Sequence, residues 1–247
     1  MAKKKLWVWI ALLSFLFTFA VNGYANYAPL NGLQTGEISD MFDVFFVPAG
    51  YVFAIWGVIY LLLFIFLIYQ LLPSQKDSTI LAEIGPYFLL ANLSNAAWLV
   101  LFHYLQHTFT IIAMLMLLIS LMAIYIRLRA KTLEGKDRFL IQLPFSVYLG
   151  WVSVATIANA TQFLYHVGWD GFGLSGEIWL VIVLVVAVLI SWLMSRKFKD
   201  LAYALVLVWA FIGIGVRFTG NALVAYSSYA AAGLVLVLYS LSMVRKK

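Results

Sequence analysis

Long apolar runs separated by short polar segments repeat along the whole chain. A helix needs about 20 mostly apolar residues to cross the roughly 30 Å hydrocarbon core of a bilayer. The runs are rich in Leu, Ile, Val and Phe, and they lack the alternation of apolar and polar positions that marks the strands of a membrane β-barrel. The pattern therefore predicts an all-α, polytopic membrane protein with eight transmembrane helices, at residues 6–22, 49–71, 84–105, 109–127, 141–166, 178–194, 200–217 and 222–243.

Basic residues fall on alternate connections between these helices. Cytoplasmic segments of membrane proteins carry an excess of Lys and Arg. With Lys3, Lys4 and Lys5 placed in the cytoplasm, every one of the 16 basic residues except Arg217 lies on a cytoplasmic segment. This distribution predicts a multi-pass protein of the plasma membrane with both termini in the cytoplasm.

The first apolar run has a second interpretation. Three lysines, an apolar run and the small-residue segment Gly23-Tyr24-Ala25 are also compatible with a cleaved signal peptide, which would leave seven helices. Trp7 and Trp9 within the run are more typical of a membrane helix anchored at the interface. We therefore favour a retained first helix.

One connection is much longer than the others. Residues 22–47 form a loop rich in Gly, Asn and Asp that also holds Phe42, Phe45 and Phe46. Long loops are uncommon and are often lids or binding loops, and large aromatic side chains are costly to expose to water. We expect a lid that folds onto the helices, the alternative being a plain surface loop.

The composition excludes several classes of protein. Apolar and aromatic residues make up 65% of the chain and charged residues only 11%, which excludes a soluble globular domain and a disordered chain. The absence of Cys excludes disulfides, zinc–thiolate sites and thiol catalysis. The net charge of +6 is accounted for by the topology and by anionic lipid headgroups, so it does not indicate a nucleic-acid partner.

Charged residues also lie only at helix ends and in loops. Proton-coupled transporters are expected to carry a carboxylate inside the membrane, and hydrolases need a metal site or a base beside a nucleophile. No such group is evident in the sequence, so chemistry must rest on amides and aromatic rings. Two helical stripes carry these groups: Asn92, Asn95, Trp98 or Leu99, Phe102 and His103 on one predicted helix, and Trp151, Ala155, Asn159, Gln162 and His166 on another.

Amides within hydrocarbon need partners, so both stripes must face protein or a ligand. One interpretation is that the amides only join the two helices. Because Trp98 and Trp151 share these faces, we favour an aromatic pocket with a few placed hydrogen-bonding groups. His103, His107 and His166 are expected at the membrane interface; an axial ligand to haem iron is the less favoured alternative, and we predict no metal site.

Three segments resemble the translocator protein, or tryptophan-rich sensory protein, family (TspO/MBR). PAGYVFAIWGVIYLLL (48–63) is similar to the opening of that family's second helix, NAAW (95–98) with Phe102 to its third, and WVSVATIAN (151–159) to its fifth. The long first loop stands where the family has its pocket cap. The likeness covers about residues 1–166. It implies a long, eight-helix, bacterial-type variant, with a TspO-like five-helix domain at 1–170 and a three-helix extension at 171–247.

That family binds tetrapyrroles and hydrophobic drug-like molecules beneath the first loop. The resemblance implies ligand-binding roles for Tyr51, Trp56, Asn95, Trp98, Trp151, Ala155 and Asn159, with Tyr51 standing where the family has a Trp. The spacing from Tyr51 to Trp56 is one residue shorter than in the family. One residue turns a helix by about 100°, so these two side chains need not face the same pocket.

The predicted function is the binding of a flat hydrophobic ligand, such as a porphyrin or haem-like tetrapyrrole, for sensing or transport. A tetrapyrrole would be the ligand, and no cofactor is required. The alternatives are a small-molecule membrane facilitator and, less favoured, a membrane-embedded enzyme acting on lipid or haem. The expected partners are the lipid bilayer and a small hydrophobic ligand; the sequence leaves open whether two copies form a homodimer.

Overall fold

The computed structural model of the chain describes residues 2–28, 30–76 and 78–244, the first four of these as backbone only. Helices dominate this part of the chain, and it contains no strand. The helices are α1 Ala2–Tyr27, α2 Thr35–Asp40, α3 Ile55–Leu71, α4 Ile80–His103, α5 His107–Arg129, α6 Gly135–Asp137, α7 Leu143–His166, α8 Gly176–Phe198, α9 Leu201–Arg217 and α10 Ala222–Val244. Short 3₁₀ segments lie at Leu30–Gly32, Gly50–Ala54, Pro73–Gln75 and Gly171–Gly173, and a π-helical turn at Arg138–Gln142 leads into α7.

The predicted polytopic, all-α membrane fold is confirmed. In the described residues, seven helical segments are long and apolar enough to cross a bilayer, and α9 is a shorter apolar helix of 17 residues. Each of the eight predicted segments corresponds to one of the long helices. Helix α2, in the first loop, and α6, before α7, are short additions that the hydropathy pattern does not predict.

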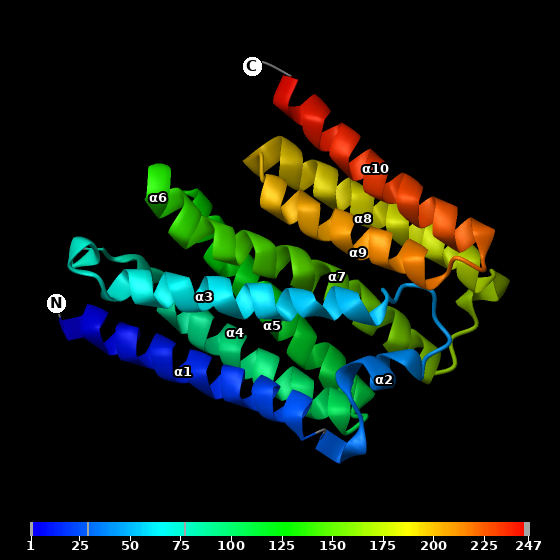
Figure 1. Cartoon of the computed structure of the whole chain (residues 1–247), viewed down its shortest axis with the longest axis horizontal. Helices are drawn as coiled ribbons and strands as arrows, with labels where there is room; N and C mark the ends of the chain where they lie inside the picture. The colour runs from blue at the N-terminus through cyan, green and yellow to red at the C-terminus, as the bar shows by residue number, and fades with distance from the viewer. Residues whose placement is uncertain (1, 29, 77, 245–247) are drawn as a thin grey trace.

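The long helices alternate in direction, so the molecule has two ends (Figure 1). We name the end that carries α2 the loop end and the opposite end the far end. Helix α1 begins and α10 finishes at the far end. The cytoplasmic location of this end stays a prediction, and the side chains of Lys3–Lys5 and residues 245–247, on which it partly rests, lie outside the described residues.

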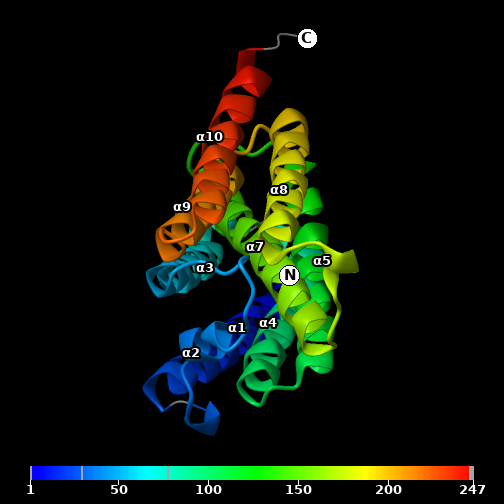
Figure 2. The same cartoon turned by 90° about the vertical axis from the view of Figure 1, so that its right-hand side faces the viewer.

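The helices form two groups that meet at α7 (Figure 2). Helix α4 packs between α1 and α5, and α5 packs on α7; α10 packs on both α8 and α9. Helix α9 joins the groups, because a Cβ on Gly150 of α7 would lie 3.1 Å from Cβ of Val206. The Tyr203 hydroxyl of α9 also donates a hydrogen bond to Oγ of Ser153 at 3.0 Å. A small residue and a short polar contact thus let α7 and α9 approach closely.

The first loop begins later than predicted. Helix α1 continues to Tyr27, so the loop starts at residue 28 rather than at residue 22. The side-chain amide of Asn22 donates to the carbonyl of Thr18 at 3.0 Å, and that of Asn26 donates to the carbonyl of Asn22 at 2.8 Å. Each amide thus bonds to a carbonyl one turn earlier in α1. Asn is common in turns, so the sequence alone predicts that the helix ends near Asn22.

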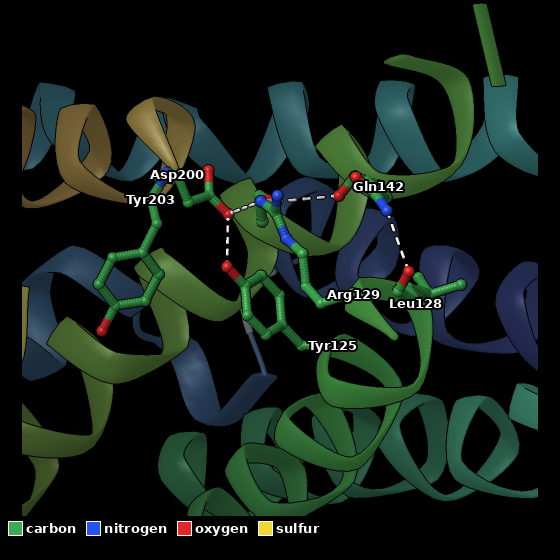
Figure 3. A network of polar contacts seen from close by, with 7 residues as sticks. Tyr125, Leu128, Arg129, Gln142, Asp200 and Tyr203 are labelled. Atoms are coloured by element: carbon green, nitrogen blue, oxygen red, sulfur yellow. Dashed lines mark hydrogen bonds and ion pairs between the residues drawn. The ribbon is translucent and has the colours of Figure 1, made fainter. Parts of the chain in front are cut away.

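A charged group lies buried at the far end (Figure 3). Asp200, the N-cap of α9, is only 4% exposed and forms an ion pair with Arg129 at the end of α5. The Tyr125 hydroxyl also donates to Asp200 at 2.7 Å, and Arg129 donates to Oγ of Ser146 on α7 at 3.2 Å. Both charges are at helix ends, as predicted, but the burial of Asp200 is not evident from the sequence. The pair joins α5, α7 and α9.

Candidate functional site

Four aromatic rings from α3 and α4 form a continuous stack near the loop end. Tyr60 stacks on Trp56 with ring centroids 5.8 Å apart, Trp56 stacks on Trp98 at 5.9 Å, and Trp98 stacks on Phe102 at 5.4 Å. Trp151 of α7 meets the edge of Trp56 at 6.3 Å and 87°. The helical spacing of four residues within α3 and within α4 aligns the rings, and the packing of α3, α4 and α7 brings them together.

Amide side chains flank this stack, and they are buried. Asn159 of α7 accepts a hydrogen bond from Nε1 of Trp98 at 3.0 Å. Asn95 of α4 donates to the Tyr148 hydroxyl at 2.7 Å and lies 3.3 Å from the Tyr60 hydroxyl. The amides therefore do join α4 to α7 and α3. However, Oδ1 of Asn95 and Nε1 of Trp151 are buried without a hydrogen-bond partner among the described residues. A buried polar atom without a partner lowers the stability of the fold unless another group pairs with it.

Two cavities lie on either side of the ring stack. The first, between α1 and α3, has a volume of about 360 Å³ and is lined by Asn22, Asn26, Phe53, Gly57 and Trp56, among others. Gly57 and Ala54 are exposed, so this cavity is open to the side. The second, beneath the first loop, measures only about 30 Å³ and is lined by Trp151, Ala155, Asn159 and Gln162, among others. Thr35, Phe53, Trp56 and Trp98 line both cavities.

The first loop closes the smaller cavity. Phe42 and Phe46 are buried, at 8% and 2% exposure, whereas Phe45 is half-buried against Phe218, just after α9. Oγ of Ser39 in α2 accepts a hydrogen bond from the Gln162 amide at 3.3 Å. Asp40 pairs with Arg217, the one basic residue outside the predicted cytoplasmic set. The loop is thus held onto the bundle by α7 and α9.

His103 holds the beginning of the loop. It is fully buried, and its Nδ1 lies 3.1 Å from the carbonyl of Leu30. Because a carbonyl only accepts, Nδ1 carries the proton, and Nε2 accepts from the Thr35 hydroxyl at 2.9 Å. Both ring nitrogens have hydrogen-bond partners, so His103 lies buried beneath the loop at the end of α4, and its location at the membrane interface stays a prediction.

We expect His103→Phe to loosen the start of the loop. The change removes two hydrogen bonds, each contributing about 1 kcal/mol, while it keeps a ring of similar size. Backbone amides of residues 30–40 should then exchange with solvent up to about thirtyfold faster in hydrogen-exchange mass spectrometry, since about 1.4 kcal/mol corresponds to tenfold. Trp192→Phe, a substitution near the far end of α8, should leave this exchange unchanged; equal protection of residues 30–40 in both variants would refute the anchoring role of His103.

His107 and His166 lie together, away from His103. Their ring centroids are 4.1 Å apart, and Phe42 of the loop packs edge-on against His107. Within the ranges that the structure describes, no three His, Asp or Glu side chains gather closely enough to hold a metal ion. The pair therefore forms part of the loop packing.

Tyr51 is placed apart from the other predicted site residues. It lies in the 3₁₀ segment before α3, is 46% exposed and meets the ring of Trp209 edge-on at 5.3 Å. Around the two cavities lie Trp56, Trp98, Trp151, Ala155 and Asn159. Asn95 lines neither cavity; its amide is held by the hydroxyls of Tyr60 and Tyr148. The shorter spacing from Tyr51 to Trp56 is consistent with this separation.

Several residues of the site are missed by the sequence analysis. Tyr60 and Tyr148 hold Asn95, Phe53 lines both cavities, and Asn22 and Asn26 face the aromatic wall from α1. Tyr60 is one helical turn after Trp56, and Asn26 is one turn after Asn22, so helical spacing could have indicated both. Phe53 carries no such signal, because its position depends on the 3₁₀ turn.

Comparisons with known proteins assign the family. A family model described as TSPO-like protein matches residues 8–241. No curated protein and no solved structure matches the chain. The matched range runs through α8, α9 and most of α10, so the likeness extends well beyond residue 166. The chain is therefore a multi-pass membrane protein that belongs to the TSPO-like family.

Proposed function

We propose that the protein binds a flat, mainly apolar ligand, of the size and shape of a porphyrin or haem-like tetrapyrrole, against the ring stack. The observation that carries this proposal is the side cavity of about 360 Å³ next to Trp56 and Trp98. Its volume is within the range of small-molecule sites, which are mostly apolar with a few polar groups. Flat conjugated rings favour offset stacking on Trp and Tyr.

The polar groups at this cavity suit the orientation of such a ligand. The amides of Asn22 and Asn26 line the α1 side, and each uses its nitrogen for a helical carbonyl, which leaves a side-chain oxygen as an acceptor. This oxygen could accept a hydrogen bond from a pyrrole N–H of the ligand. The unpaired Nε1 of Trp151 lines the smaller cavity, which has room for only one or two water molecules. A ligand would reach that N–H only after the shared wall or the loop moves.

The experiment is a titration of protoporphyrin IX into the full chain in lipid nanodiscs, read by equilibrium dialysis against empty nanodiscs. Gly57→Phe is the decisive variant, because Gly57 lines the side cavity, a Cβ on it meets no atom within 4 Å, and a ring there would occupy the cavity. We expect the dissociation constant to rise at least tenfold in Gly57→Phe and in Trp98→Leu. Tenfold corresponds to about 1.4 kcal/mol, the upper range for an aromatic pair.

Trp192→Leu is the matched control. Trp192 lies near the far end of α8, with Arg196 over its ring at 5.0 Å, and it contacts neither cavity. Its substitution should leave porphyrin affinity unchanged. If wild type, Gly57→Phe and Trp192→Leu bind equally, the side cavity is not the site. Counter-flow of labelled porphyrin in proteoliposomes separates a transporter, which accelerates exchange, from a sensor, which does not.

A further inference from the structure

A third cavity, of about 450 Å³, lies between α7 and α8 near the loop end. Its walls are apolar side chains of the two helices: Ile157, Ala160, Leu164, Ile182, Val183 and Val186. Residues 43–46 of the first loop and residues 169–174 close it at the loop end. Helix α8 packs against α9 and α10, which leaves this groove on the side that faces α7. We name it the α7–α8 groove.

The groove is separate from the ring stack. Among the residues that the structure describes, none lines both the groove and either of the cavities beside Trp56. On α7, Ala155, Asn159 and Gln162 point to the smaller cavity, whereas Ile157 and Leu164 line the groove, which places the two sets on opposite faces at 100° per residue. In the loop, Phe46 lines the groove and Val47 the smaller cavity.

The groove has an aromatic and acidic mouth. Trp169 and Trp179 lie with ring centroids 4.7 Å apart, and Nε1 of Trp179 donates to the carbonyl of Gly171 at 2.7 Å. Gly171 has a φ of +64°, and a Cβ there would lie 2.6 Å from Nε1 of Trp179, so this turn requires glycine. Asp43 and Asp170 also line the groove, and among its described lining residues there is no Lys, Arg or His.

We propose that the α7–α8 groove binds a lipophilic cation, that is, an apolar body carrying a positively charged ammonium group. Aromatic faces attract ammonium groups, and two carboxylates beside them add a favourable charge. A molecule with an anionic head would meet only negative charge at the mouth. Ile182 and Val186 are exposed along the side of the groove, where a bilayer would surround α8, so the apolar body can enter from the membrane.

The test uses labelled decyltrimethylammonium, with decanol as the uncharged analogue and decyl sulfate as the anionic one. Each is bound to the full chain in nanodiscs of zwitterionic lipid and measured by scintillation proximity against empty nanodiscs. We expect saturable binding of the cation, at least tenfold tighter than that of decanol, and no saturable binding of decyl sulfate. Similar binding of all three would mean simple partition into the membrane and would overturn the proposal.

Two pairs of substitutions locate the charge effect. The double substitution Asp43→Asn with Asp170→Asn should weaken cation binding at least tenfold and leave the binding of decanol unchanged. The turn should be kept, because Asn at position 170 can still accept a hydrogen bond from the backbone N–H of Phe172, as Asp170 does at 2.9 Å. The control pair, Glu37→Gln with Glu177→Gln, also removes two negative charges at the loop end, but from residues that do not line the groove. That control should keep the wild-type affinity, and an equal loss in both pairs would refute recognition by the groove.

Occupation of the groove is tested by filling it. Ala160→Phe should abolish binding of the cation and of decanol alike, because it places a ring between the two helix walls. Gly57→Phe should leave cation binding unchanged, since Gly57 lines only the other side cavity. Loss of cation binding in Gly57→Phe would assign the cation to the ring stack and overturn a second site.

Discussion

Replacing Arg129 with Met is expected to lower the free energy of unfolding by about 3–5 kcal/mol, the usual range when one partner of a buried ion pair is removed. The side chains of Arg129 and Asp200 are 12% and 3% exposed, so water cannot solvate the carboxylate once the guanidinium is absent. The Tyr125 hydroxyl and the backbone N–H of Tyr203 still bond to Asp200, but they carry no compensating charge. Reversible unfolding in mixed micelles of mild detergent and dodecyl sulfate measures the change.

The double substitution Arg129→Met with Asp200→Asn provides the internal check. Asn keeps the N-cap hydrogen bond of α9 and removes the unpaired charge, so we expect most of the lost stability to return. Lys131→Met is the matched control, because Lys131 and Glu83 form an exposed pair, 28% and 41% accessible, that should contribute at most about 1 kcal/mol. Equal losses in Arg129→Met and Lys131→Met would show that the far-end network is not a stabilising element.

Gly213→Val is expected to detach the start of α3 from α9. A Cβ at position 213 would lie 2.2 Å from Cγ2 of Val52 and 3.2 Å from Cβ of Pro48. The carbonyl of Gly213 also accepts from the backbone N–H of Ala49 at 3.1 Å, so the clash falls on short, stiff side chains of a segment that is held against α9. Overpacking typically costs about 1–3 kcal/mol, and we expect the upper part of this range.

The Gly213→Val substitution should also disturb the ring stack. The segment that Gly213 holds leads directly into Phe53 and Trp56, and Nε1 of Trp209 on α9 donates to the carbonyl of Val52 at 3.2 Å. We therefore expect Gly213→Val to shift the fluorescence of the buried tryptophans and to lower the melting temperature. Gly233→Ala in α10 is the control, because a Cβ there meets nothing within 4 Å. Since Ala favours a helix more than Gly does, this substitution should raise the free energy of unfolding by up to about 1 kcal/mol.

These contacts suggest a role for the last three helices. Through Gly213, Trp209 and Arg217, α9 holds the beginning of α3 and the first loop, and Phe218 just after it packs on Phe45. In the same part of the molecule, α8 supplies one wall of the α7–α8 groove. We expect the extension to support the site and to add the α7–α8 groove as a third cavity, while the domain boundary at residue 170 stays a prediction.

The helices of this protein follow from local patterns in the sequence. The length of each apolar run and the polar segments between the runs predict eight helices, because hydrocarbon admits only segments that satisfy their own backbone hydrogen bonds. Helical spacing also placed Asn95 and Trp98 on one face and Trp151 and Asn159 on another. Motif resemblance then indicated the family that the comparison confirmed.

Which side chains these helix faces contact depends on the way the helices pack. Spacing shows which side chains share a helix face, but the distance between faces depends on packing of helices far apart in the chain. The stack of Trp56 on Trp98, the burial of Asp200 beside Arg129 and the groove between α7 and α8 all join residues from different helices. Local patterns carry no information on such pairings, since close approach depends on small residues such as Gly150 and Gly213 opposite particular partners.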